Sequence, residues 1–264
     1  MKDHRKSVTD QMGNKVDVPA NPERIISLVP SQTELLFDLG LEKALVGVTK
    51  FCIHLNPQVR EKIKIGGTKK FHFDRITQLA PDLIIGNKEE NYREGIERLK
   101  RFYPVWMSDI SNLEDNRMMI TAVGQICNRP SQAHSITGRI DKLLHNFEPV
   151  TNKSVLYFIW RKPFMAVGGG TYIHEILNLC GFNNVMHKYT RYPELSADQI
   201  KAYNPEVILL SSEPYPFKAQ HIAEFESLCP NAKILLVDGE MFSWFGSRLI
   251  KALPYFQQLK PLLH

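Results

Sequence analysis

Residues 24–40, RIISLVPSQTELLFDLG, place a strand, a turn and a helix in direct succession. Residues 24–29 are a short apolar run rich in β-branched side chains, which predicts a strand buried inside a sheet. A proline ends this run, and Ser31 then stands where it would cap a helix with Glu34 at its third position, the pattern of a capping box. Gly40 predicts the end of that helix. The stretch therefore predicts one β–α unit of an α/β fold.

The same alternation of strands and helices continues along the chain. Strands are predicted at short apolar runs, and helices where apolar residues recur every three or four positions. This alternation favours a mostly parallel sheet with helices on its faces. The predicted strands are residues 45–48, 83–85, 105–106 and 155–159, and the predicted helices are residues 74–79, residues 92–101 and a segment capped by Thr171 that ends at Gly181.

Two segments of the first half recur in the second half. Residues 34–40 match residues 175–181, with an acidic residue, two aliphatic residues and a closing glycine at the same spacing. Residues 74–85, DRITQLAPDLII, match residues 198–209, DQIKAYNPEVIL. Because both matches occur in the same order, they predict an α/β protein of two similar lobes.

A helix is predicted at residues 130–147, between the two repeats. Pro130 suits its first turn, and about 18 residues would make a helix about 27 Å long. Such a helix could bridge two lobes as a strut, and the alternative is an ordinary helix packed on the first lobe. We therefore predict an N-terminal lobe at residues 16–129, a linker helix at 130–148 and a C-terminal lobe at 149–264.

The bulk properties exclude several classes of protein. The chain has 264 residues and a net charge of +5 that is spread along its length, so the concentrated basic stripe of a nucleic-acid-binding protein is missing. The four cysteines form no CxxC pair and predict buried thiols, not a disulfide framework or a zinc site. No apolar run is long enough for a membrane helix or a secretory signal. As written, the sequence predicts a protein without an export signal.

No sequence motif indicates an enzyme. The chain lacks the GxSxG, GxxxxGK[ST] and HExxH patterns. Residues 168–171, GGGT, could hold an anion at a helix N-terminus, but without GxGxxG spacing a plain turn and helix cap is favoured. His54 and His72 could reach a metal ion, although single histidines in loops are usually just exposed.

Large aromatic and charged residues gather in five segments that follow predicted strands. In open α/β sheets, ligands bind beyond the carboxyl ends of the strands, and exposed aromatics with a polar rim indicate a large, partly apolar ligand. Core packing is the alternative for each of these side chains. The candidates are Phe51, Asn87, Glu89, Trp160, Phe164, Glu213, Tyr215, Phe242, Trp244, Phe245 and Arg248.

The chain resembles the periplasmic substrate-binding proteins of ABC importers whose two lobes are joined by a single long helix, and among them the cobalamin-binding subgroup. The resemblance covers about residues 16–260. It implies a monomeric protein, not an enzyme, that needs no cofactor, captures cobalamin or a similar metal chelate between its lobes and delivers it to membrane permease subunits. The motifs that carry it are RIISLVPSQTELLFDLG, GVTKFC, APDLIIGNKEEN, RYPELSADQI and MFSWFGSR.

The resemblance also assigns roles to residues. It places Phe51 and Tyr192 where relatives set aromatics against the corrin, and Trp160 with Phe164 in the matching loop of the second lobe. Where those relatives have tryptophans in the first lobe, this chain has Asn87 and a stretch around residues 68–69. The sequence therefore leaves the identity of the ligand open.

Asp74 and Asp198 occupy matching places in the two repeats. The resemblance implies that they dock the two membrane subunits of a transporter, since relatives use one acidic residue at this place in each lobe. The alternative is that each carboxylate caps the start of a short helix or interacts with its dipole.

Two further interpretations remain open at this point. A haem or ferric-siderophore binder has the same architecture, and so does a metal chelatase, in which His54, His72, Glu89 and Glu90 would be metal ligands or bases. The family implies a periplasmic or cell-envelope location, whereas the missing signal implies a cytoplasmic one if the sequence is complete.

Overall fold

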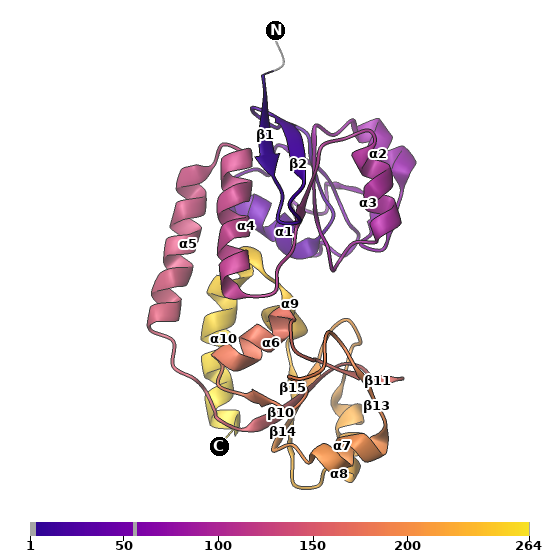
Figure 1. Cartoon of the computed structure of the whole chain (residues 1–264), viewed down its shortest axis with the longest axis vertical. Coiled ribbons are helices and arrows are strands. Elements are labelled where there is room, and N and C mark those ends of the chain that lie inside the picture. The colour runs from indigo at the N-terminus through magenta and orange to yellow at the C-terminus, as the bar shows by residue number, and fades with distance from the viewer. Residues whose placement is uncertain (1–3, 55–56, 264) are drawn as a thin grey trace. The chain divides into compact units, whose positions relative to one another are not determined.

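The computed structural model describes residues 4–54 and 57–263. The chain forms two compact units, each an α/β lobe (Figure 1), which confirms the predicted fold class. Lobe 1 comprises the chain up to Ile110, Glu114–Asp141 and Phe245–Arg248, and lobe 2 comprises Ser111–Leu113, Lys142–Trp244 and the chain from Leu249. The separate linker at residues 130–148 stays a prediction. The return of Phe245–Arg248 to lobe 1 was not predicted.

Lobe 1 is built on a five-stranded parallel sheet with the strand order β5-β4-β3-β8-β9. Two short antiparallel pairs, β1–β2 and β6–β7, lie outside this sheet. The strands are β1 (Arg5–Thr9), β2 (Lys15–Pro19), β3 (Ile25–Ser27), β4 (Leu45–Val48), β5 (Ile63–Lys64), β6 (Gly66–Gly67), β7 (Lys70–Phe71), β8 (Leu83–Asn87) and β9 (Val105–Ser108). The helices are α1 (Pro30–Asp38), α2 (Phe73–Leu79), α3 (Arg93–Lys100), α4 (Leu113–Ile126), α5 (Pro130–His145) and the short 3₁₀ helix η2 (Gly246–Arg248).

Lobe 2 is built on a sheet with the order β13-β11-β10-β14-β15, in which β10, β14 and β15 are parallel and β12 pairs with β10. β11 and β13 add an antiparallel edge. The strands are β10 (Ser154–Trp160), β11 (Phe164–Ala166), β12 (Asn183–Asn184), β13 (Glu194–Leu195), β14 (Val207–Ser211) and β15 (Lys233–Val237). The helices are α6 (Tyr172–Leu179), α7 (Ala197–Tyr203), η1 (Ala219–His221), α8 (Ile222–Leu228), α9 (Gly239–Ser243) and α10 (Leu249–Leu263).

The internal repeat is visible in the element bounds. α7 and β14 begin and end 124 residues after α2 and β8. Both helices end on a residue with left-handed backbone, Ala80 in lobe 1 and Asn204 in lobe 2. The acidic residues that follow are also equivalent, since Asp82 accepts the backbone N–H groups of residues 23 and 24 while Glu206 accepts that of Ser154. The sequence match therefore reflects a duplicated structural unit.

The capping box predicted at Ser31 is wrong. α1 begins at Pro30, its N-cap is Val29, and no side chain caps it. Proline suits the first helical position because its fixed φ matches the helix and it has no N–H to satisfy. Glu34 then lies too far along the helix for a capping box, and its carboxylate instead pairs with Arg248.

α5 packs on lobe 1 through one face that carries Ala133, Ile136 and Ile140. A Cβ at Gly124 of α4 would lie 2.4 Å from the Cβ of Ala133, so the two helices approach closely at this glycine. Up to Asp141, α5 groups with lobe 1, and its role as a linker between the lobes stays a prediction.

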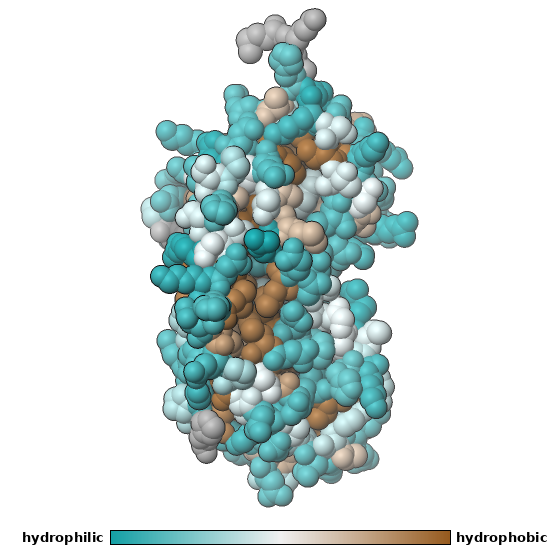
Figure 2. All heavy atoms as spheres, turned by 60° about the vertical axis from the view of Figure 1, so that its left-hand side comes forward, coloured by the Kyte–Doolittle hydropathy of each residue, from teal (hydrophilic) through white to brown (hydrophobic). Residues whose placement is uncertain are grey.

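The surface and core agree with a folded chain of ordinary composition. All four cysteines are buried and free, as predicted. Figure 2 shows one face of the molecule, on which hydrophilic side chains predominate and hydrophobic ones gather in smaller areas. None of the helices in the described part of the chain is both long and apolar enough to cross a membrane.

Candidate ligand-binding site

Two loops meet at the carboxyl edge of the lobe 2 sheet and bring Trp160 and Tyr215 together. Trp160 ends β10 and is 39% exposed, and its ring meets that of Tyr215 edge-on at 5.6 Å between centroids. The backbone N–H of Tyr215 donates to the carbonyl of Ile159 at 3.2 Å, which ties the loop after β14 to the end of β10. The predicted convergence of strand-end loops therefore holds here, and part of the Trp160 side chain is exposed to solvent.

Glu213 joins the loop after β14 to the end of α9. Its Oε1 accepts the Ser243 hydroxyl at 2.7 Å and the Trp244 indole N–H at 3.0 Å. Trp244 is only 9% exposed. Glu213 therefore orients Trp244, and most of that ring packs inside the protein.

Two aromatic candidates have structural roles in lobe 2. Phe242 is 0% exposed, and its ring packs against Tyr157 and Phe256. Phe164 lies in β11, half-buried against Phe225. Core packing, the alternative interpretation, thus applies to Phe242, whose burial removes it from any surface that a ligand could touch in this structure.

An ion pair that the sequence did not single out joins the loop after β10 to helix α8. Arg161 donates from Nε to Glu224 at 2.7 Å and from its second guanidinium nitrogen at 3.3 Å. Because the two residues are 63 positions apart, no local spacing could have indicated the pair. It anchors the loop after β10 to α8.

In lobe 1, two interlocked asparagines hold the turn after β8. Asn87 accepts the backbone N–H groups of Glu89 and Glu90 at 2.9 and 3.0 Å, and Asn91 accepts the N–H of Asn87 at 2.9 Å. Both asparagines are buried. Asn87 therefore shapes the turn, which places the half-buried Glu89 and Glu90 at the carboxyl edge of the sheet.

A lysine accompanies these two carboxylates. Lys69 donates to the backbone carbonyl of Glu89 at 2.5 Å. Burial raises the pKa of the Glu90 carboxyl, an effect that the Lys69 ammonium opposes and the Glu89 charge reinforces. The edge thus carries charges of both signs.

Phe51 provides an exposed aromatic at the same edge of lobe 1. Its side chain is 49% exposed and follows β4, and the Lys50 ammonium lies 5.0 Å from the ring centroid. A Cβ at Gly67 would lie 3.2 Å from the ring, so Phe51 rests on the β6–β7 turn. About half of this side chain is thus open to solvent, and its contact with a ligand stays a prediction.

The GGGT motif makes a close backbone approach. A Cβ at Gly168 would lie 2.2 Å from the carbonyl oxygen of Tyr189, and one at Gly169 would lie 2.2 Å from that of His187. The N–H groups of these glycines donate to Arg191 and Tyr189. They are therefore not available to an anion, and the plain turn followed by a helix cap at Thr171 is confirmed.

Tyr192 lies in the segment that packs on this turn. It is half-buried, and the neighbouring Pro193 carbonyl accepts the N–H of Ala166 at 3.0 Å. The contact of Tyr192 with a ligand stays a prediction.

Arg248 belongs to a buried ion pair within lobe 1. Its Nε donates to Glu34 Oε2 at 2.7 Å, and the side chains are 5% and 2% exposed. Gly246 donates its N–H to the side-chain oxygen of Asn116, and Phe245 is buried beside it. The structure thus gives the segment Phe245–Arg248 an anchoring role, and the prediction that its side chains face a ligand has no support from their positions.

The metal-ligand interpretation is not supported by the geometry. Within residues 4–54 and 57–263, no three His, Cys, Asp or Glu side chains are placed to hold a metal ion. His54, His72, Glu89 and Glu90 are therefore not gathered into a cluster such as a chelatase would need.

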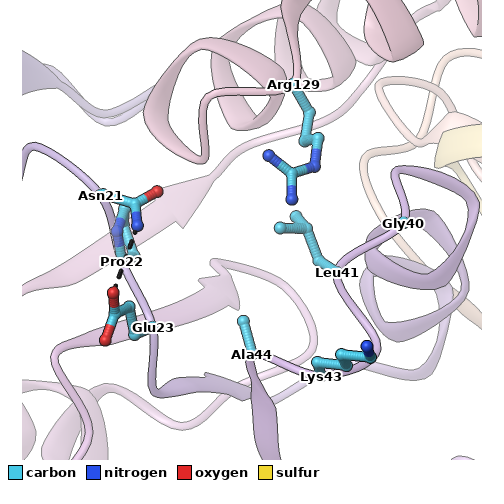
Figure 3. A pocket seen from close by; sticks show the side chains of 8 residues that line it. All are labelled: Asn21, Pro22, Glu23, Gly40, Leu41, Lys43, Ala44 and Arg129. Carbon is cyan, nitrogen blue, oxygen red and sulfur yellow. Dashed lines mark hydrogen bonds between the residues drawn. The ribbon is translucent and has the colours of Figure 1, made fainter.

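A pocket of about 280 Å³ lies in lobe 1, at the amino ends of β3 and β4 and therefore on the edge opposite the loops just described (Figure 3). Arg129 points into it, and Asn21 donates to Glu23 at its rim. Because ligands of open α/β sheets bind at carboxyl ends, we do not include this pocket in the site. Its lining residues are Asn21, Pro22, Glu23, Gly40, Leu41, Lys43, Ala44 and Arg129.

Residues 25–227 match the periplasmic binding protein family. The chain belongs to this family. A vitamin B12-binding protein of Vibrio parahaemolyticus is 29% identical over 195 residues, which are 72% of this chain and 70% of that protein. Its relatives and structural neighbours are binding proteins and not enzymes, in agreement with the sequence interpretation.

Three solved structures share the fold of this periplasmic binding protein. The periplasmic vitamin B12 binding protein of Vibrio cholerae has a TM-score of 0.77 at 22% identity, covering 93% of this chain and 99% of that one. The petrobactin-binding protein of Bacillus subtilis has a TM-score of 0.81 at 17% identity, covering 99% of both chains. A periplasmic heme-binding protein in complex with two hemes has a TM-score of 0.79 at 21% identity, covering 91% of this chain and 99% of that one.

Asp74 and Asp198 of this periplasmic binding protein have equivalent positions. Each is the second residue of its helix, α2 or α7, and each is exposed. The start of α7 is capped by Ser196 in a capping box with Gln199, so Asp198 is not needed as a cap. The Lys201 ammonium lies 3.9 Å from Oδ1 of Asp198, whose side chain is 96% exposed.

Proposed function

We propose that this periplasmic binding protein captures cobalamin or another bulky metal chelate and delivers it to an ABC permease. The observation that carries the proposal is the partly exposed Trp160 side chain at the carboxyl edge of the lobe 2 sheet, held by Tyr215. Phe51 offers a second exposed ring at the corresponding edge of lobe 1. Aromatic faces with a polar rim suit a large macrocycle that is partly apolar.

The residues of the proposed site divide by what they do. Phe51, Trp160, Tyr215 and Tyr192 would contact the ligand, and Glu89 would supply a polar group at the rim. A second set supports these contacts through packing or hydrogen bonds. The supporting residues are Asn87, Phe164, Glu213 and Trp244.

Haem or a ferric siderophore is the second candidate ligand. Lys50 is exposed beside Phe51 and Lys69 is exposed at the turn of Glu89, and both could attract the acidic groups of such a chelate. Proteins named for binding heme and petrobactin share the fold. The protein would act in the periplasm or cell envelope as a monomer, and no resident cofactor enters the proposal.

Titration of the intrinsic tryptophan fluorescence tests the choice of ligand. We expect cyanocobalamin to quench the fluorescence with a dissociation constant of about 1 μM or lower, equivalent to about 8 kcal/mol, because Trp160 would lie against the chelate. Hemin and ferric enterobactin are titrated in parallel. Tight binding of one of these and none of cyanocobalamin would replace the first candidate by the second. Absence of binding by all three would refute the proposed function.

The two aspartates are the proposed docking points for the permease. We expect the double variant Asp74→Ala, Asp198→Ala to lose at least about tenfold in affinity for a candidate ABC permease in nanodiscs, because ion pairs across an interface depend on both charges. Its free energy of unfolding should change by less than about 1 kcal/mol, since the exposed carboxylates contribute a helix-dipole interaction and, at Asp198, a solvent-exposed ion pair with Lys201.

Two controls separate docking from helix capping. Ser196→Ala removes the real cap of α7 and should cost about 1 kcal/mol without weakening permease binding. Glu97→Ala, Glu226→Ala removes two other exposed carboxylates and the same net charge. Permease binding that falls equally in this second control would reduce the role of the aspartates to general electrostatic attraction.

A further inference from the structure

The side chain of Asn184 holds the segment at residues 184–192 of lobe 2. Its Nδ2 donates to the Val167 carbonyl at 3.0 Å and lies 3.1 Å from His174 Nδ1, and its Oδ1 accepts the N–H of Met186 at 3.0 Å. Because Oδ1 must face a donor and Nδ2 a carbonyl, the amide has only one orientation that satisfies all three contacts. Asn184 is buried, so water cannot replace these bonds.

This orientation fixes the protonation of His174. Since Asn184 presents an N–H group to Nδ1, that nitrogen must carry a lone pair, and the imidazole is neutral with its proton on Nε2. The ring is held in place by α6, because the backbone N–H of His174 donates to the capping hydroxyl of Thr171 at 3.2 Å. Nε2 lies 3.1 Å from Nδ2 of Asn178, so the exposed amide of Asn178 has to turn its oxygen toward Nε2 to accept this proton.

The segment held in this way carries the tyrosines of lobe 2. Tyr189 is 50% exposed and its hydroxyl bonds that of Tyr203 at 3.2 Å, while Tyr192 follows three residues later. The carbonyl oxygen of Tyr189 packs against Gly168, and that of His187 packs against Gly169. The segment therefore packs closely on Gly168 and Gly169, a contact called the seat below. The hydrogen bonds of Asn184 fix the beginning of the segment.

The groups around His174 decide how it titrates. Burial lowers its pKa, Glu175 of the same helix raises it, and His187 of the held segment lowers it. The segment also carries Lys188 and Arg191, and α9, which packs on α6, carries Glu240. A lowered pKa means that His174 binds a proton less readily when the segment is packed on Gly168 and Gly169 than when it is released. Its stability is therefore complete above the ordinary histidine pKa of about 6.5 and declines as the pH falls below that value.

We propose that His174 and Asn184 are positioning residues for the tyrosine segment at 187–192, and that a proton on Nδ1 of His174 releases this segment and weakens ligand binding. The added N–H would face the N–H of Asn184, so the bond to His174 is lost and a buried donor is left unsatisfied. The seat on Gly168 and Gly169 then opens. The ligand part of the inference rests on the proposed function, whereas the opening of the segment does not.

Hydrogen exchange tests the opening without any ligand. The amides of Gly168, Gly169 and Arg191 donate across the seat, so their protection factors report its opening. After correction for intrinsic exchange, we expect their protection to fall about five- to tenfold from pH 7.5 to pH 5.5, within the limit of one decade per pH unit for a single proton. The protection factors of the β14 amides should not change over this pH range. Protection at the seat that is independent of pH would overturn the proposal.

Matched variants assign the effect to His174. In His174→Asn the side-chain oxygen can take the place of Nδ1 and accept the same N–H without titrating, so the fall in protection should disappear. His187→Asn, at the neighbouring histidine, should retain it. A pH-dependent fall that persists in His174→Asn would contradict the assignment. If that variant does not fold, the imidazole nitrogen chemical shifts of His174 are measured in the unmodified protein instead. A proton on Nδ1 at pH 7.5 would refute the proposed release of the segment by protonation of His174.

Cyanocobalamin and hemin are the probes for the ligand part. Whichever of them binds at pH 7.5 should bind at least about fivefold more weakly at pH 5.5, and equally well at both values in His174→Asn. Affinity independent of pH, with the exchange effect present, would overturn the ligand part alone. If neither probe binds, the proposed function is in question. The hydrogen-exchange result still shows whether protonation of His174 releases the segment.

Discussion

Replacing Arg248 by alanine is expected to cost about 3–5 kcal/mol of unfolding free energy, because the Glu34 carboxylate would remain buried without its charged partner. The pair lies 2.7 Å apart with both side chains almost fully buried. Urea unfolding followed by circular dichroism measures the loss as a lower midpoint with an unchanged slope. The predicted ligand role of Arg248 would instead show as weaker binding with normal stability.

Two further variants show where the cost arises. The double variant Glu34→Leu, Arg248→Met replaces the pair by apolar side chains and should recover most of the loss, since no charge is left buried. Arg139→Ala, at an exposed position of α5, should change the unfolding free energy by less than about 0.5 kcal/mol. A double variant as unstable as Arg248→Ala would show that packing, not the unpaired charge, dominates.

Truncating Trp160 to alanine is expected to weaken ligand binding at least tenfold, and by about 2 kcal/mol if the ring is central to the site. The ring is 39% exposed and stands against Tyr215, so most of the fold does not depend on it. Isothermal titration with the ligand identified by fluorescence measures the loss, and thermal unfolding checks that the protein remains folded.

The matched control for Trp160 is Phe102→Ala. Phe102 is 73% exposed and precedes β9, so it lies at the amino edge of the lobe 1 sheet. Its removal should leave affinity unchanged. Equal losses in both variants would mean that the effect of Trp160 is not local, and an unchanged affinity in Trp160→Ala would remove that residue from the proposed site.

The fold was predictable where neighbouring residues decide it. The apolar runs at β4 and β8, the glycine after α1 and the cap at Thr171 act over a few residues, and each was located from the sequence. α4 was not predicted, although Met119, Ile120 and Val123 have helical spacing within it. The signal was present but lacked a clear cap or glycine stop.

The site was predictable only in part, for a physical reason. Sequence position after a strand predicted which loops converge, and Trp160 with Tyr215 confirm the convergence within lobe 2. Position after a strand does not distinguish an exposed ring from a buried one. The sequence therefore proposed both Phe242 and Trp160 as ligand contacts, although only Trp160 is exposed. Nor could it reveal Arg248 with Glu34, because the partners are separated by 214 positions and only the folded chain brings them together.

The placement of η2 limits how this protein can be divided for study. A fragment ending after Asp141 would contain nearly all of lobe 1 but would lack Phe245–Arg248, which belongs to the same unit. Glu34 would lose its ion pair with Arg248, and Asn116 would lose its hydrogen bond from Gly246. Expression of the two halves as independent domains is therefore a poor strategy, whereas a circular permutant that carries Phe245–Arg248 alongside residues 4–141 would keep the lobe whole.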